Sequence, residues 1–367
     1  MVDNNNNNFN NDNTLLENEF FSSGDIPKTD YSNNINNQIN LVEFIPKGFT
    51  PKSYGEKKGI KRATNAMSIS VIFTLLISFL ISFLLPFGLM AMGYSLKEMM
   101  ELLVEPGFNQ IFQIFFSVFT FTVPYIVIFK LFKFRISDLI SFKVPKRKNF
   151  LSLILIGISI CSFANIAVSY ANAIFSGFGI EYDVNFGENP DGILGFVLTF
   201  ISTVIVPAFV EEFAFRGIIL GSLKKYGEAF AIIVSSVMFG FMHANFEQIP
   251  FAFMVGLVLG YIAVKTESIW PAILVHGYNN FVSVAFSYFF NNYSVEFQNI
   301  IYTIILSVSL FLGILALFIT KDSKELLSLN EADTETKESK KYLWVFVSPF
   351  TILFLIGSVF LSLTYLS

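Results

Sequence analysis

The sequence predicts an all-α fold: a polytopic helical membrane protein with about nine transmembrane helices. Hydrophobic residues make up 53% of the 367-residue chain and charged residues only 14%, which is too apolar for a soluble domain of this length. The apolar runs are roughly 17 to 25 residues long, the length that a helix needs to cross a bilayer core of about 30 Å. Basic and acidic loops alternate between these runs, as expected for spans that cross the membrane in turn.

The N-terminal region, residues 1–62, is predicted to be a disordered Asn-rich cytoplasmic tail followed by a basic linker. Residues 1–46 are rich in Asn and lack clustered apolar side chains, so they cannot bury a core of their own. By the positive-inside rule, the basic residues just ahead of the first apolar run place the N-terminus in the cytoplasm. These residues are Lys57, Lys58, Lys61 and Arg62.

The predicted spans fall into three groups. Residues 63–192 hold three N-terminal transmembrane helices, residues 193–289 hold four, and residues 290–367 hold two together with a charged cytoplasmic loop. The loop charges predict a multi-pass protein of the cell membrane with its N-terminus inside and its C-terminus outside. The expected spans are 66–91, 108–132, 150–175, 193–216, 229–244, 249–264, 269–289, 297–320 and 342–366.

A cluster of ionisable residues stands at the end of the fourth apolar run, where such groups are costly and therefore mark a functional site. On a helix, Glu212 and Arg216 lie one turn apart in the orientation that favours an ion pair, and we expect a structural pair. Glu211 points about 100° away and has no such partner, so it is the acid left for chemistry. Pro207, one turn earlier, loosens the helix and leaves a nearby backbone carbonyl without its usual donor.

Both histidines of the chain lie in the apolar segments that follow. His243 stands one turn after Phe239, and His276 stands one turn before Asn280, so the members of each pair share a helix face. Taken singly, His276 is equally well explained by a hydrogen bond between helices, Asn280 is better explained by one, and His243 could cap or pack its helix. Because they gather within about 70 residues of the unpaired Glu211, we expect one watered cavity, open to the cytoplasmic side.

These residue types suit peptide hydrolysis, which needs an activated water, a donor to the carbonyl oxygen and a proton for the leaving amine. Glu211 can act as general base while His243 holds the water, and His276 and Asn280 can donate to the oxyanion. A second interpretation uses Glu211, His243 and His276 as ligands of a catalytic divalent metal such as zinc. The sequence leaves both open, although it lacks the His-Glu-x-x-His helix of the common zinc proteases.

Three motifs in this region resemble those of a known family. They are Glu211-Glu212-x-x-x-Arg216, Phe239-x-x-x-His243 and His276-x-x-x-Asn280. They resemble the signature motifs of the CPBP intramembrane proteases, the group of type II CAAX prenyl endopeptidases and bacteriocin-processing enzymes also called the Abi family.

The resemblance covers about residues 193–289, a quarter of the chain, which it identifies as a CPBP-like protease core. It implies that Glu211 and His243 activate water and that His276 and Asn280 form the oxyanion hole. The remaining motif residues, Glu212, Arg216 and Phe239, would support them. Metal-dependent and metal-free mechanisms are both argued for the family, so the resemblance leaves the metal open.

The first functional hypothesis is an intramembrane endopeptidase that cleaves at or near the cytoplasmic membrane face, in CAAX-type or leader-peptide processing. Its partners would be the lipid bilayer and a peptide or protein substrate, prenylated in the CAAX case. A net charge of −4 argues against a nucleic-acid partner. The alternative is a non-catalytic bacteriocin-immunity or scaffold protein that retains the motifs. A transporter would need an internal repeat, which the sequence does not show.

Overall fold

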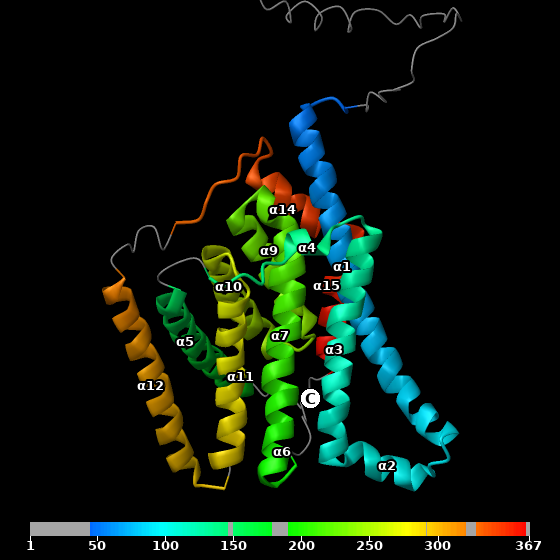
Figure 1. Cartoon of the computed structure of the whole chain (residues 1–367), viewed down its shortest axis with the longest axis vertical. Helices are drawn as coiled ribbons and strands as arrows, with labels where there is room; N and C mark the ends of the chain where they lie inside the picture. Colours follow the sequence, from blue (N-terminus) through cyan, green and yellow to red (C-terminus); the bar gives the residue numbers. More distant parts are fainter. Residues whose placement is uncertain (1–44, 146–149, 178–189, 291, 321–327, 365–367) are drawn as a thin grey trace, which may run out of the picture. The chain divides into compact units, whose positions relative to one another are not determined.

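The computed structural model describes residues 45–145, 150–177, 190–290, 292–320 and 328–364 (Figure 1). Every regular element in these ranges is a helix, which confirms the predicted all-α class. The predicted Asn-rich tail lies outside the described residues as far as residue 44. The basic linker is described, and from Pro51 onward it is helical.

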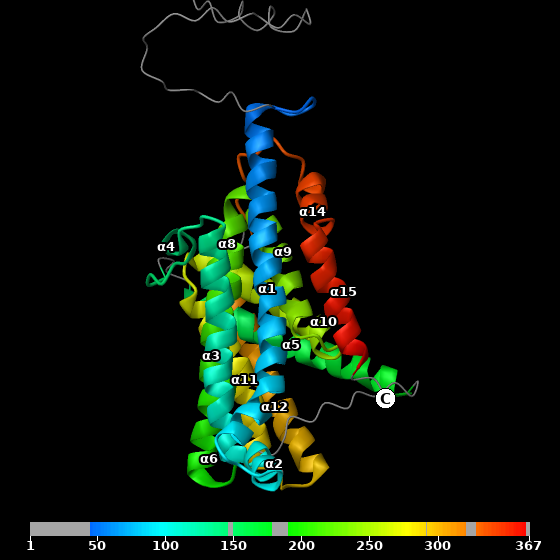
Figure 2. The same cartoon turned by 90° about the vertical axis from the view of Figure 1, so that its right-hand side faces the viewer.

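The N-terminal helices form one side of the described bundle. Helix α1 (Pro51–Ala91) begins with a capping box, in which the Thr50 hydroxyl accepts from the Ser53 N–H at 3.1 Å and the Ser53 hydroxyl accepts from the Thr50 N–H at 2.9 Å. Its 41 residues extend over about 60 Å, twice the thickness of a bilayer core, so the basic linker continues the first span beyond the membrane. Helix α3 (Pro106–Leu131) packs along α1 (Figure 2), after the short α2 (Leu96–Val104).

A long helical rod from Gly192 to Tyr226 runs through the centre and is interrupted twice. Two π-helical segments, which are frequent at functional sites, bracket the short helix α7 that ends in Glu212. Pro207 lies in the first turn of α7, where its missing N–H accounts for the first interruption. In order, the segments are α6 (Gly192–Thr199), η1 (Phe200–Ile205), α7 (Val206–Glu212), η2 (Phe213–Ile219), α8 (Leu220–Leu223) and η3 (Lys224–Tyr226).

Helices α9, α10 and α11 pack against this rod. Helices α9 and α10 form a tight hairpin, because a Cβ on Gly256 would lie only 3.0 Å from the Cβ of Ser236. The turn that joins them puts Ala244 in the left-handed region with φ +47°. Their bounds, with those of the other helices, are α4 (Ile136–Leu139), α5 (Phe150–Gly177), α9 (Glu228–Met242), α10 (Gln248–Thr266), α11 (Trp270–Phe290), α12 (Val295–Ile319), α14 (Glu338–Phe346) and α15 (Pro349–Leu363).

All nine predicted spans correspond to helices, but the count of nine membrane crossings is not confirmed. Among the described residues, six helices are long and apolar enough to cross a membrane, and the pair α14–α15, bent by 64°, would make a seventh. Helix α9 has only 15 residues. Helix α11 has 21 residues but is not among the six, and the polar run from His276 to Asn280 in its middle lowers its hydropathy.

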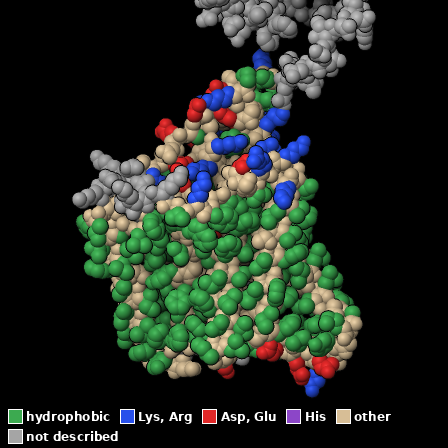
Figure 3. Space-filling model, viewed as in Figure 1, with side chains coloured by type: hydrophobic (Ala, Val, Ile, Leu, Met, Phe, Trp, Pro, Cys, Tyr) green, Lys and Arg blue, Asp and Glu red, His purple; other side chains and the backbone are tan. Residues whose placement is uncertain are grey.

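Charge divides the described bundle into two ends separated by an apolar band (Figure 3). One end of the bundle carries α4, η3 and α14 (Figure 1). Lys and Arg gather at this end in the same view (Figure 3), and we call it the basic end. At the other end, which carries α2 and the starts of α6 and α12, acids predominate, and we call it the acidic end. The acids there are Glu98, Glu101, Glu105, Asp191 and Glu296.

Candidate functional site

The predicted ion pair is present and fully buried. Arg216 Nη1 donates to Glu212 Oε1 at 2.8 Å, and neither side chain is exposed to solvent. Arg216 Nη2 also donates to the Gly256 carbonyl on α10 at 3.3 Å, and its guanidinium lies 4.3 Å from the centre of the Phe239 ring on α9. Arg216 therefore joins three helical segments, which is how the planar, multiply donating guanidinium is commonly used in buried pairs.

Glu212 has a second partner that the sequence did not predict. Its Oε1 also lies 2.9 Å from His276 Nδ1 on α11, and because a carboxylate oxygen can only accept, the ring donates from Nδ1. This bond turns the other ring nitrogen toward the neighbouring acid: His276 Nε2 lies 3.9 Å from Glu211 Oε2. Glu212 thus orients His276 as well as pairing with Arg216, whereas Glu211 accepts no hydrogen bond from Arg216.

His243, directly after the last residue of α9, is held by its own helix. Its Nδ1 lies 2.9 Å from the Phe239 carbonyl, so Nδ1 is the donor and Nε2 is left as an acceptor. The Phe239 ring packs edge-on against both imidazoles, with centroids 5.1 Å from His243 and 6.0 Å from His276. Phe239 therefore separates and positions the two histidines.

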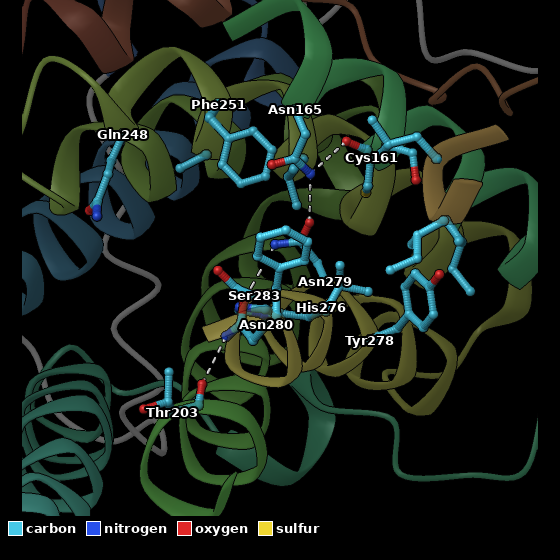
Figure 4. Close-up of a pocket in the computed structure, with 18 of the residues that line it drawn as sticks. Cys161, Asn165, Thr203, Gln248, Phe251, His276, Tyr278, Asn279, Asn280 and Ser283 are labelled. Carbon is cyan, nitrogen blue, oxygen red and sulfur yellow. Dashed lines mark hydrogen bonds between the residues drawn. The ribbon is translucent and has the colours of Figure 1, made fainter. Parts of the chain in front are cut away.

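Asn280 sits in a row of side-chain amides that links three elements (Figure 4). Its Nδ2 donates to the Thr203 carbonyl at 3.1 Å. Pro207, four residues later, has no N–H to donate to this carbonyl. This confirms the prediction that Pro207 leaves a nearby carbonyl without its usual donor. Asn279 Nδ2 donates to Asn280 Oδ1 at 3.4 Å, and Asn165 Nδ2 on α5 donates to Asn279 Oδ1 at 3.0 Å. One N–H of the Asn280 amide remains available.

The four candidate residues Glu211, His243, His276 and Asn280 line one cavity of about 840 Å³. A large part of its remaining lining comes from the second half of α11 and the first half of α12, whose connection lies at the acidic end. Ser283, Ser287 and Asn299, the exposed side chains in the lining, all belong to these halves.

The cavity therefore opens toward the acidic end. The physical reason is depth: Glu211 lies 15 residues, or about 22 Å of helix, below Tyr226 at the basic end. The short helix α9 likewise ends well inside the apolar band. His243, directly after α9, and Gln248 and Phe251 at the start of α10 then border the cavity. The expected opening on the cytoplasmic side stays a prediction, because neither end of the bundle is assigned to the cytoplasm.

The proposed metal ligands do not form a metal site in this arrangement. Within the described ranges there is no group of three His, Cys, Asp or Glu side chains that could hold a metal ion. Glu211 and His276 approach each other, but His243 does not complete a set with them. His276 also uses one ring nitrogen for Glu212.

Sequence reasoning missed several residues of the site. Asn165 and Asn279 lie within apolar spans, where an amide side chain is as unusual as a histidine. Their position in these spans could therefore have marked them as site residues. The Thr203 carbonyl carries no such signal, because its role depends on the register between the rod and α11. Gln248 also lines the cavity from the first turn of α10 (Figure 4).

Two comparisons with known proteins give a match. A family model described as "Type II CAAX prenyl endopeptidase Rce1-like" matches residues 193–282, a segment that contains all three motifs. A protein of Bacillus subtilis (strain 168) named "Putative membrane peptidase YdiL" is 36% identical over 107 residues, covering 26% of this chain and 43% of the relative. The similarity therefore spans less than half of that relative. No solved structure matches the chain.

The apolar helices and the matched segment make residues 193–282 similar to membrane-embedded proteases. The matched segment is thus similar to the type II CAAX prenyl endopeptidases, which supports the resemblance to the CPBP family seen in the three motifs.

Proposed function

We propose that this chain is a membrane-embedded endopeptidase in which Glu211 is the general base. The observation that carries the proposal is the unequal use of the two adjacent acids. Glu212 is occupied by Arg216 and His276, whereas Glu211 faces the cavity with His276 Nε2 at 3.9 Å. That separation is too long for a direct hydrogen bond, and a water molecule bridging both groups would close it.

In the proposed reaction, Glu211 takes a proton from this water as its oxygen attacks the scissile carbonyl carbon. His243 holds the same water through Nε2, the ring nitrogen that the Phe239 carbonyl leaves free. When the tetrahedral intermediate collapses, the proton moves from Glu211 to the leaving amine nitrogen. The C–N bond then breaks, and the new acid and amine leave.

The negative charge on the carbonyl oxygen needs a donor held in place before the reaction. Asn280 supplies its remaining amide N–H, since its other N–H is held by Thr203 and its oxygen accepts from Asn279. His276 donates from Nε2 when its ring is protonated, and Glu212 fixes the ring plane. Asn165, Asn279 and Glu212 are therefore positioning residues in this proposal.

We place cleavage in the half of the membrane nearer the acidic end, since the cavity opens there. If the basic residues lie in the cytoplasm, as the positive-inside rule predicts, this is the non-cytoplasmic half. The substrate is a peptide or protein segment. A leader peptide or a membrane-anchored segment reaches such a cavity directly, whereas a prenylated CAAX tail must approach from the lipid.

The test is Glu211→Gln, which keeps the size of the side chain and removes the base. In proteoliposomes supplied with a fluorogenic leader peptide and, separately, a farnesylated CAAX peptide, we expect cleavage to fall about 10³-fold. The matched control is Glu98→Gln, the same change on the exposed face of α2, and we expect it to cleave at the wild-type rate.

Full activity of a folded Glu211→Gln protein would refute the assignment of the base. The competing function, a non-catalytic immunity or scaffold protein, predicts that bacteriocin protection of cells persists in the same variant. Thermal unfolding of the purified variant shows whether a loss of cleavage reflects the chemistry or the fold.

A further inference from the structure

A second cavity, of about 690 Å³, lies at the basic end. It is formed by the end of the basic linker in α1, the turn between α3 and α4, the segment from Gly221 to Glu228, and residues 330–332. None of the candidate catalytic residues lines it. Its cationic lining consists of Arg62, Lys133, Arg135, Lys224 and Lys225.

The carboxylates in the same lining leave most of this positive charge unpaired. Asp138 lies 3.4 Å from Arg135 Nε, and Glu228 accepts from both the backbone N–H and the side-chain amide of Asn330, at 2.8 and 3.1 Å. Glu331 is the third carboxylate in the lining. Among the described residues, the four other cations, Arg62, Lys133, Lys224 and Lys225, form no ion pair.

The cavity is built on backbone that is held firmly. A Cβ on Gly221 would lie 2.3 Å from the Leu139 carbonyl oxygen, so α8 packs directly against the backbone of α4. The Arg62 guanidinium lies over the Phe134 ring at 4.5 Å. Lys133 has φ +60°, a strained value for a lysine, which the surrounding turn maintains. The cations therefore converge without a large rearrangement.

The depth of these cations points to a ligand in the membrane surface. Arg62 precedes the apolar part of α1, Lys133 follows the apolar helix α3, and Lys224 follows the apolar part of the rod. Each therefore lies where a span leaves the hydrocarbon, at the level of lipid phosphates. The blue side chains border the green apolar band in Figure 3.

We propose that this cavity binds the phosphate headgroup of an anionic phospholipid. Lys and Arg side chains at the headgroup level attract anionic lipids, and basic pockets between transmembrane helices hold their headgroups. Arg62 can bind a phosphate through two N–H groups at once, while the lysines act as point charges. The acyl chains would lie along the exposed apolar faces beside the cavity.

The experiment uses the full chain purified in detergent and titrated with short-chain phosphatidylglycerol or phosphatidylcholine, with bound lipid counted by native mass spectrometry. We expect the wild type to prefer phosphatidylglycerol. The variant K133Q/K224Q/K225Q should bind it on the order of 100-fold more weakly, at roughly fivefold per lysine. The matched control is K97Q/K337Q/K340Q, which removes three exposed lysines that do not line the cavity, and it should bind as the wild type does.

Equal binding of the two lipids, or unchanged affinity in the cavity variant, would overturn the proposal. Inorganic phosphate is the third ligand tested: if it displaces phosphatidylglycerol at equal concentration, the site recognises free phosphate and the lipid assignment fails. If the triple variant does not fold, K133Q alone is used, with about a fivefold loss expected. Cleavage activity does not enter this readout, so the result is independent of the proposed peptidase function.

Discussion

Among the described residues, two basic side chains are buried, Arg216 and Lys341. They differ in how many of the polar atoms around them have a hydrogen-bond partner. Lys341, near the basic end, donates to the Tyr226 carbonyl at 2.6 Å, to the Thr334 hydroxyl at 2.8 Å and to Glu338. All three ammonium protons therefore have acceptors. The cluster is closed and has no capacity for another ligand.

The region around Arg216 is incomplete by comparison. Arg216 Nε and Glu212 Oε2 are buried without a hydrogen-bond partner among the described residues, and the one used oxygen of Glu212 serves both Arg216 and His276. Unsatisfied buried polar atoms are costly and are kept mainly where function requires them. The comparison indicates that the Lys341 region stabilises the fold, whereas the Arg216 region holds polar groups ready beside the cavity.

The largest expected effect is that of Arg216→Met. Removing one member of a buried pair leaves Glu212 as an uncompensated buried charge, so we expect unfolding to become easier by about 3–5 kcal/mol. Adding Glu212→Leu removes the stranded charge and should restore part of this stability without restoring cleavage. Denaturant titration of both proteins checks this. An Arg216→Met protein as stable as the wild type would show that the pair is unimportant for the fold.

Lys341→Met should have a smaller effect, of about 1–3 kcal/mol, because it strands the Tyr226 carbonyl and the Thr334 hydroxyl rather than a fully buried charge. The rate of cleavage per folded molecule should equal that of the wild type. The two rates are compared after correction for the folded fraction. If the folded Lys341→Met protein cleaved more slowly than the wild type, Lys341 would not be a purely structural cation.

Asn165→Ala tests the uncharged row of side-chain amides that ends at Asn280 and lines the same cavity as Glu211. Without the Asn165 amide, Asn279 is free to rotate, and the Asn280 N–H loses part of its orientation. We expect kcat to fall about tenfold with KM unchanged, since a group aimed at the transition state is affected rather than substrate binding. The control is Asn172→Ala on the same helix, whose amide bonds Glu247 outside this row. Equal effects of the two variants would contradict the positioning role.

The smallest effect concerns Asp333, in the segment that also carries Thr334. Its hydrogen bond from Lys52 at 2.7 Å, and the charge of Lys52, hold the pKa of the Asp333 carboxyl below its ordinary value. The folded state therefore binds this proton less readily than the unfolded state, so the stabilisation is present at neutral pH and is lost as the pH falls through the lowered pKa. Trp344 fluorescence, on α14, should report a slight loosening below about pH 4 that Asp333→Asn lacks. An identical profile in the two proteins would assign the loosening to other acids.

Rules that depend only on neighbouring residues in the sequence predicted the helices and one ion pair of this protein. Apolar run length located helices at all nine predicted spans, and the spacing of Glu212 and Arg216 predicted their ion pair. The count of nine crossings is not confirmed, because α9 is short and α11 carries a polar run. Contacts between helices were predicted less well. The hydrogen bond from His276 to Glu212, for example, depends on the register of α11 against α7.

The sequence by itself determined the membrane class, the helices, the free carboxylate and the four polar residues that line the cavity, because each follows from spacing or composition along the chain. Only the tertiary structure decided which end the cavity faces, that Glu212 orients His276, and that Asn165 and Asn279 hold Asn280. It also brought the cations of three separate spans around one cavity. The physical reason is that helix depth and rotation are set by side-chain packing between segments far apart in the chain, which no local periodicity encodes.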